Sequence, residues 1–164
     1  MKRVPLTHGM EAVVDDCDYE HVMQWKWRFE REGHRRTGYA VRWRATHGTR
    51  TLIKMHRLVA EHSGLAVDRK QIDHVDGNGL NNCRNNLRVA TPSQNRANLH
   101  RARNNTSGFK GVGWSRHNGR FRAYIGVAGR HLHLGYFDDP QDAARAYNEA
   151  ALKHYGEYSC LNPV

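Results

Sequence analysis

The chain has 164 residues, a length that suits one domain of ordinary size or two or three very small ones. Only 38% of the residues are apolar, which argues against one large core and favours small units with dense aromatic packing or a metal. The formal charge of +10 is typical of proteins that bind nucleic acid, although a solvated basic surface on an unrelated enzyme is the alternative.

Cysteine spacing and apolar runs exclude further classes of protein. Cys17, Cys83 and Cys160 are far apart and lack the paired spacing of zinc sites, which predicts reduced thiols in a cytoplasmic protein. No run approaches about 18 apolar residues, and no apolar stretch follows the first few residues. We therefore expect neither a membrane span nor a signal peptide.

Residues 1–54 are predicted to form a small strand-rich segment. Asp15 is a candidate cap for a short helix, because carboxylates are favourable at helix starts. Residues 25–29 and 39–44 alternate in the manner of half-buried strands, and the polar residues 30–38 between them predict a turn. The basic side chains on these strands, including Arg42 and Arg44, fit either a solvated face or a track of phosphate contacts.

The next predicted unit covers residues 55–100 and follows a strand at residues 50–54. Its predicted elements are, in order, a helix at 55–62, a strand at 71–75, a tight turn at 76–79, a strand from 86 to 89, and a second helix. The start of that second helix is well specified, because Thr91 can cap it and Pro92 suits its first position.

Four side chains of this unit have the types that phosphodiester hydrolysis needs. A strand, strand and helix can bring Asp73 and His74 close to Asn95, although they are far apart in sequence. Carboxylate and amide oxygens such as Asp73 and Asn95 suit a hard divalent cation. The imidazole of His74 can act as the general base, and an amide such as Asn86 can hold it in one orientation.

This stretch resembles the HNH endonucleases of the ββα-metal type, especially phage homing and intron-associated members. The resemblance covers about residues 55–98 and rests on Asp73-His74, Asp76-Gly77-Asn78, Asn86-Leu87-Arg88 and Asn95. It implies that Asp73 and Asn95 bind the metal, that His74 is the general base and that Asn86 positions it. Many members carry His where this chain has Asn95, and an oxygen ligand there favours Mg²⁺ or Mn²⁺ over zinc.

After a basic linker at residues 101–108, residues 109–164 predict a sheet packed on one helix. The strands are expected at residues 109–114, 120–127 and 130–137, and the helix after Asp139 and Pro140, ending at Gly156. Alternation places Phe121, Ala123, Ile125, Leu132 and Leu134 on the face that meets the helix. The other face then carries Arg120, Arg122, Tyr124, His131 and His133, so it is expected to meet the polyanion.

Residues 105–162 resemble the plant Apetala/ethylene-response-factor DNA-binding domain. The matching segments are Gly108-Phe109-Lys110-Gly111-Val112, Leu134-Gly135-Tyr136-Phe137, Ala143-Ala144-Arg145-Ala146-Tyr147-Asn148 and Leu161-Asn162. The resemblance implies that the sheet lies in the major groove. Candidate contacts are Lys110, Trp114, Arg116, Arg120, Arg122, Tyr124 and His133, and we expect Arg130, Arg88, Arg42 and Arg44 to contact DNA as well. Because the plant domains often use Trp where this chain has His133, their base specificity does not transfer.

The combined patterns predict an α+β protein that is a site-directed, divalent-metal-dependent DNA endonuclease. We expect a monomer that acts on double-stranded DNA, needs Mg²⁺ or Mn²⁺ but no small-molecule cofactor, and nicks one strand with His74 as general base. The alternative is a sequence-specific DNA-binding regulator whose nuclease unit is inactive.

Overall fold

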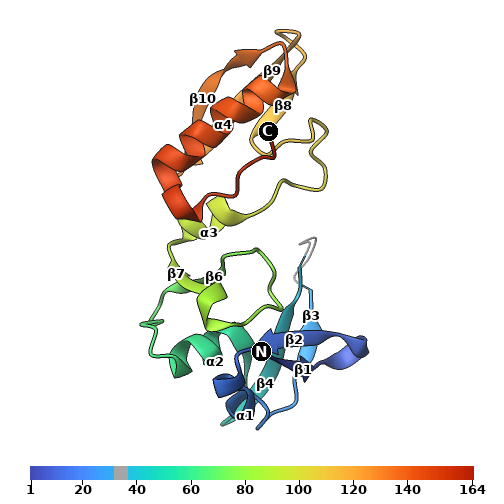
Figure 1. Cartoon of the computed structure of the whole chain (residues 1–164), viewed down its shortest axis with the longest axis vertical. Helices are drawn as coiled ribbons and strands as arrows, with labels where there is room; N and C mark the ends of the chain where they lie inside the picture. The colour runs from blue at the N-terminus through green and yellow to red at the C-terminus, as the bar shows by residue number, and fades with distance from the viewer. Residues whose placement is uncertain (32–36) are drawn as a thin grey trace. The chain divides into compact units, whose positions relative to one another are not determined.

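The structure, a computed structural model, describes residues 1–31 and 37–164, and most of the turn expected at residues 30–38 lies outside them. The chain divides into two compact units, Met1–Thr91 and Pro92–Val164, which we call the first and second units (Figure 1). Both units combine helices with antiparallel strands, which confirms the predicted α+β class.

The described residues of the first unit form a two-stranded ribbon, a three-stranded sheet, two α-helices and a final hairpin. In chain order its elements are β1 (Lys2–Pro5), β2 (Glu11–Val14), α1 (Asp16–Val22), β3 (Arg28–Glu30), β4 (Tyr39–Thr46), β5 (Thr49–Lys54), α2 (Met55–His62), β6 (Gln71–His74) and β7 (Leu87–Ala90). The pairs β1–β2 and β6–β7 are antiparallel, and the larger sheet has the order β3-β4-β5.

One apolar core joins the expected strand-rich segment to the residues that follow it. Val4, Val14 and Val22 from the first segment pack in the same cluster as Met55 and Leu87. Residues 1–54 and the β6–β7 hairpin therefore share a core within one compact unit.

The strand expected at residues 25–29 is shorter than predicted. Regular pairing begins only at Arg28, because the preceding residues fold back against the end of α1. The buried Trp27 donates its indole N–H to the carbonyl of Val22 at 2.8 Å, and the amide of Trp25 contacts the same oxygen at 3.3 Å. These contacts with the helix end prevent extension of the chain here.

A buried carboxylate ties together three segments of the first unit. Asp18 on α1 is fully buried and accepts two 2.7 Å hydrogen bonds from the guanidinium of Arg84. Its Oδ1 also lies 2.7 Å from Nδ1 of His62 at the end of α2. Burial alone would raise the pKa of Asp18, but the bonds from Arg84 and His62 leave it below its ordinary value.

The second unit begins with a short helix and continues as a sheet with one long helix. Its elements are α3 (Pro92–Asn98), β8 (Val112–Ser115), β9 (Arg120–Val127), β10 (Arg130–Phe137) and α4 (Pro140–Tyr155), with sheet order β10-β9-β8. The predicted bounds of the last two strands and of α4 are confirmed. The first strand starts later than expected, at Val112, because Gly111 has a φ of 73° and its Cα lies against the ring of Tyr147.

The long helix α4 covers one face of this sheet. The side chain of Asp139 accepts a 2.7 Å bond from the amide of Gln141, and Gly156 ends the helix as predicted. Its buried stripe of Ala143, Ala144 and Tyr147 packs on the inner sheet face. Within residues 1–31 and 37–164, α4 and every other helix is too short or too polar to span a bilayer.

Helix α3 is anchored within the second unit by contacts at both of its ends. Ser93 Oγ lies 3.0 Å from the hydroxyl of Tyr155. At the other end the carbonyl of Ala97 accepts bonds from the amide of Cys160 at 3.1 Å and from the ammonium of Lys110. These contacts explain why the second unit starts at Pro92.

Candidate functional site

The β6–β7 hairpin places a buried ion pair at the predicted metal position. Asp73 faces Arg88 directly across the two strands, and both side chains are largely buried. Arg88 donates from Nε and Nη2 to Oδ2 of Asp73, at 3.0 and 2.9 Å. The guanidinium of Arg88, a predicted DNA contact, thus lies beside Asp73 at the candidate active site.

The predicted general base, His74, is buried at the end of β6 and has a fixed hydrogen-bond partner. Its Nε2 lies 3.2 Å from Oδ1 of Asn82. The amide nitrogen of Asn82 points to the sulfur of Met55 and the carbonyl of Leu80, so Oδ1 is the acceptor. The proton of neutral His74 is therefore on Nε2, and the lone pair is on Nδ1.

Burial also sets the protonation state of this imidazole. Removal from water lowers the pKa of His74, and the bond to Asn82 and the nearby carboxylates of Asp76 and Asp73 only partly oppose that effect. His74 is thus neutral at physiological pH. A neutral imidazole is the form that can accept a proton from water.

Asn82 is a site residue that the sequence analysis missed, since it assigned the positioning of the base to Asn86. Asn86 lies in a single 3-10 turn (Arg84–Asn86) just before β7, and not within the strand as expected. Its Oδ1 accepts from the amide of Asp76 at 3.0 Å, and its Nδ2 donates to Asp76 Oδ1 at 2.9 Å and to the carbonyl of Asn81 at 2.7 Å. Asn86 therefore organises the loop that carries Asn82.

That loop, residues 75–86, is fixed from several sides. Asp76 accepts bonds from the amide of Asn78 and the side chain of Asn81, both at 2.8 Å. Although burial raises the pKa of Asp76, these bonds bring it below its ordinary value. Strand β2 also holds the loop, because Val13 exchanges 2.8 Å backbone bonds with Leu80 and Asn82.

Two more rings pack around the base. His56, at the start of α2, is buried and meets the ring of His74 edge-on with 4.8 Å between centroids. Tyr39 lies 5.5 Å from His56 and 5.9 Å from His74. Burial lowers the pKa of His56 well below its ordinary value, so two neutral imidazoles are in contact.

The two predicted metal ligands, Asp73 and Asn95, are oxygen donors, which suit a hard cation better than zinc. Residues 1–31 and 37–164 contain no cluster of three or more His, Cys, Asp or Glu side chains that could hold a metal ion. Asn95 lies on the first turns of α3, as predicted, and so belongs to the second unit. One carboxylate and one amide oxygen are compatible with Mg²⁺, which usually keeps several waters and binds substrate phosphate.

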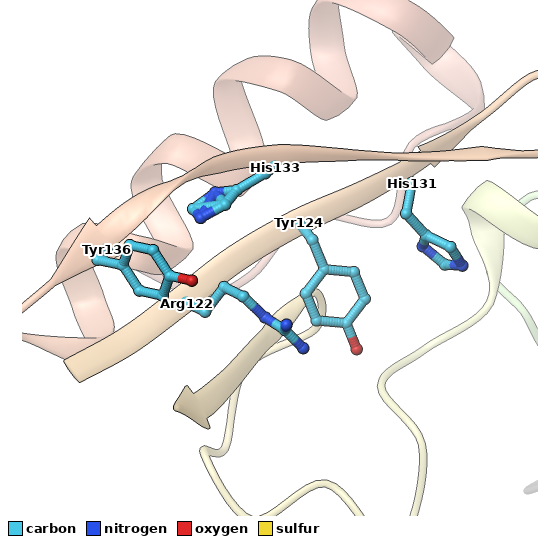
Figure 2. A pocket seen from close by; sticks show the side chains of 5 residues that line it. All are labelled: Arg122, Tyr124, His131, His133 and Tyr136. Atoms are coloured by element: carbon cyan, nitrogen blue, oxygen red, sulfur yellow. The ribbon is translucent and has the colours of Figure 1, made fainter. Parts of the chain in front are cut away.

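On the second unit, five side chains line a hollow of about 490 Å³ on the sheet face opposite α4, which we call the outer face. Figure 2 shows Arg122 and Tyr124 from β9 beside His131, His133 and Tyr136 from β10, all on the same side of the sheet. The predicted contacts Arg122, Tyr124 and His133 are therefore brought together.

A β-bulge in β10 shapes this hollow. The register shifts between His133 and Gly135, and Gly135 has a φ of 140°. Tyr136 consequently pairs with Arg122 on the outer face, while Phe137 pairs with Phe121 on the inner one. Tyr136 was not among the predicted contacts, although a glycine inside a strand pattern is a signal for a bulge.

Other predicted DNA contacts lie elsewhere on the second unit. Lys110 is half-buried: burial lowers its pKa to about 8, and its ammonium donates to the carbonyl of Ala97. Trp114 pairs with Phe121 and meets that ring edge-on at 4.9 Å, on the face opposite Arg122, and its side chain is 53% exposed.

The remaining predicted contacts are exposed or packed on other side chains. Arg116 and Arg130 are exposed, whereas Arg120 forms two 2.8 Å bonds with Asp138. In the first unit Arg44 is exposed, but the guanidinium of Arg42 lies 4.2 Å from the centroid of Trp25. Arg42 therefore has a packing role of its own.

The β6–β7 hairpin lies within the part of the chain that resembles a known family. Residues 54–97 match the model of the HNH endonuclease family. Protein 3.8 of Escherichia phage T7 is 42% identical over 59 residues, which cover 36% of this chain and 49% of the phage protein. An uncharacterised HNH endonuclease of Acanthamoeba polyphaga mimivirus is 33% identical over 93 residues, or 57% of this chain and 47% of the viral protein.

The chain thus spans about half the length of these two viral relatives. An AP2-like ethylene-responsive transcription factor of Arabidopsis thaliana is 39% identical over 62 residues, which are 38% of this chain but 13% of the plant protein. No solved structure matches the chain. Residues 54–97 of the chain are therefore similar to the HNH endonuclease family.

Proposed function

We propose that the protein is a site-directed, divalent-metal-dependent DNA endonuclease. The observation that carries this proposal is the buried, neutral His74, which is held by Asn82 and lies next to the carboxylate of Asp73 in the strand. The family match of residues 54–97 supports the same class of reaction.

In the proposed reaction Nδ1 of His74 accepts a proton from the attacking water. The water oxygen forms a bond to phosphorus, and the bond from phosphorus to the 3′ oxygen breaks. The departing 3′ oxygen takes a proton from solvent water, which leaves 5′-phosphate and 3′-hydroxyl ends. Asp73 and Asn95 are the proposed ligands of Mg²⁺ or Mn²⁺, which supplies stabilisation of the charge on phosphate and leaving oxygen when bound. Arg88 holds Asp73 in place on the hairpin through its two hydrogen bonds.

The outer face of the second unit is the proposed reader of duplex DNA. It combines the cationic Arg122 with two tyrosines and two histidines, and the basic net charge favours contact with phosphates. We propose that the protein acts as a monomer with one site and therefore nicks a single strand in each event.

A nicking assay tests this function against a DNA-binding regulator with an inactive nuclease unit. Supercoiled plasmids that carry random inserts are incubated with the full chain and Mg²⁺ or Mn²⁺, and the conversion to open circles is followed. The endonuclease proposal requires metal-dependent nicks with 5′-phosphate ends. Specific binding without nicks in either metal would instead favour the regulator.

Replacement of Asn82 by Ala should slow nicking by about 10- to 100-fold, as expected when a residue that orients a reacting imidazole is removed. Asn82→Asp keeps an acceptor for Nε2 of His74 and should retain more of the activity. Single-turnover nicking rates and thermal unfolding of both variants provide the measurement. Equal losses for both variants, with normal folding, would contradict a positioning role for Asn82.

A further inference from the structure

The hollow on the outer face is rich in hydrogen-bond donors. Arg122 can only donate, and its guanidinium lies 5.4 Å from the ring centroid of Tyr124, which supports it from one side. On the other strand, His133 meets the ring of Tyr136 edge-on with 4.5 Å between centroids. Figure 2 shows these side chains around the same hollow.

The β-bulge fixes which nitrogen of His133 carries the proton. The amide of Gly135 donates to Nδ1 of His133 at 3.1 Å, a contact that the register shift between these residues makes possible. Because Nδ1 is the acceptor, neutral His133 holds its proton on Nε2. His133 is thus a donor, and none of the five described lining residues is fixed as an acceptor.

A surface of donors selects acceptors on the bases. In the major groove guanine presents N7 and O6, two acceptors whose spacing suits the paired N–H groups of an arginine. Cytosine presents the N4 amino group and adenine places its N6 amino group beside N7, so both would set a donor against Arg122. Loss of such a match typically lowers affinity by about 5- to 150-fold.

We propose that Arg122 reads one guanine of the target and that His133, fixed as an Nε2–H donor by the bulge, reads an acceptor on the adjacent base pair. This inference rests on the proposed function, since it names what the second unit recognises. It assigns Arg122 and His133 as specificity-determining residues.

The experiment measures binding of the full chain in EDTA, so that cleavage plays no part. Duplexes are first selected from a random pool, and each guanine of the enriched site is then replaced by 7-deazaguanine or by an adenine pair. At one guanine, replacement by adenine should lower the affinity of the protein for the duplex by about 5- to 150-fold. Replacement of the same guanine by 7-deazaguanine should also lower that affinity. Arg122→Lys should weaken binding and abolish the sensitivity to 7-deazaguanine, because lysine cannot form the paired contact.

Two further measurements separate the roles of the side chains. His133→Phe should relax the preference at the neighbouring base pair but keep the guanine requirement. Arg145→Lys, on the exposed side of α4 and paired with Asp142 at 2.6 Å, is the matched control and should bind like the wild type. In the unmodified protein ¹⁵N NMR at neutral pH should show the proton of His133 on Nε2. This measurement does not depend on whether the variants fold.

The outcomes distinguish this inference from the proposed function. Failure to enrich any duplex would overturn sequence-directed DNA binding and the inference with it. An enriched site without an essential guanine, a guanine whose effect persists in Arg122→Lys, or a proton on Nδ1 of His133 would overturn the inference alone. Nicking with Mg²⁺ or Mn²⁺ is scored in a separate assay.

Discussion

Replacement of His74 by Ala should lower the nicking rate by about 10²- to 10⁴-fold, because the variant lacks the group proposed to take the proton from water. Affinity for DNA should be nearly unchanged, since the side chain is buried in the first unit and contributes no charge when neutral. Single-turnover cleavage and equilibrium binding, each with the same DNA, provide the two measurements. A large loss of nicking rate with little change in DNA affinity is the result expected if His74 takes part in the chemical step.

Two controls make this result specific. His154→Ala changes an exposed histidine near the end of α4 and should cleave normally. Added imidazole should restore part of the activity of His74→Ala but should not accelerate the wild type, since only the variant has space for a free base. Full activity in His74→Ala would remove His74 from the reaction and require another base.

The largest effect on folding is expected for Asp18→Asn. The change removes a fully buried carboxylate that binds Arg84 and His62, and loss of one partner from such a network typically costs on the order of 3 kcal/mol. Urea unfolding measures the difference. Asp16→Asn is the matched control on the same helix, because Asp16 is exposed and should leave the unfolding midpoint nearly unchanged.

The same variant predicts how stability depends on pH. The folded pKa of Asp18 lies below its ordinary value, so its contribution is complete above the unfolded pKa of about 4 and is lost as pH falls through the lower folded value. The wild type and Asp18→Asn should therefore differ most near neutral pH and converge in acid. A constant difference at all pH values would show that the charge of Asp18 is not what stabilises the fold.

Local signals in the sequence were sufficient to predict the bounds of most strands and of the long helix in the second unit. The bounds of β9, β10 and α4 follow from turn residues such as Gly119 and Gly129 and from the cap at Asp139, all of which act over a few positions. The first strand was predicted to start at residue 109, three residues earlier than Val112, because alternation was applied to residues 109–111. These residues precede the strand, and the left-handed Gly111 breaks the parity.

The candidate active site was predictable only in part. Asp73 and His74 could be proposed from the sequence because their types and their place at the end of a strand are both local properties, and β6 does end at His74. Asn82 was missed because residues 78–86 contain several asparagines, and only contacts with distant residues distinguish among them. Met55 and Val13 hold Asn82 in the orientation that reaches His74, and no periodicity in the sequence reports such contacts.

The segment that matches the HNH family is not a self-contained module at either end. The loop before β7 depends on bonds from Val13 and on the ion pair of Arg84 with Asp18, which come from outside residues 54–97. At the other end, Ala97 is held by Lys110 and Cys160. Transfer of the proposed nuclease chemistry to a DNA-binding protein would therefore need the flanking contacts to be grafted as well, because the family-matched residues alone lack the contacts that order them.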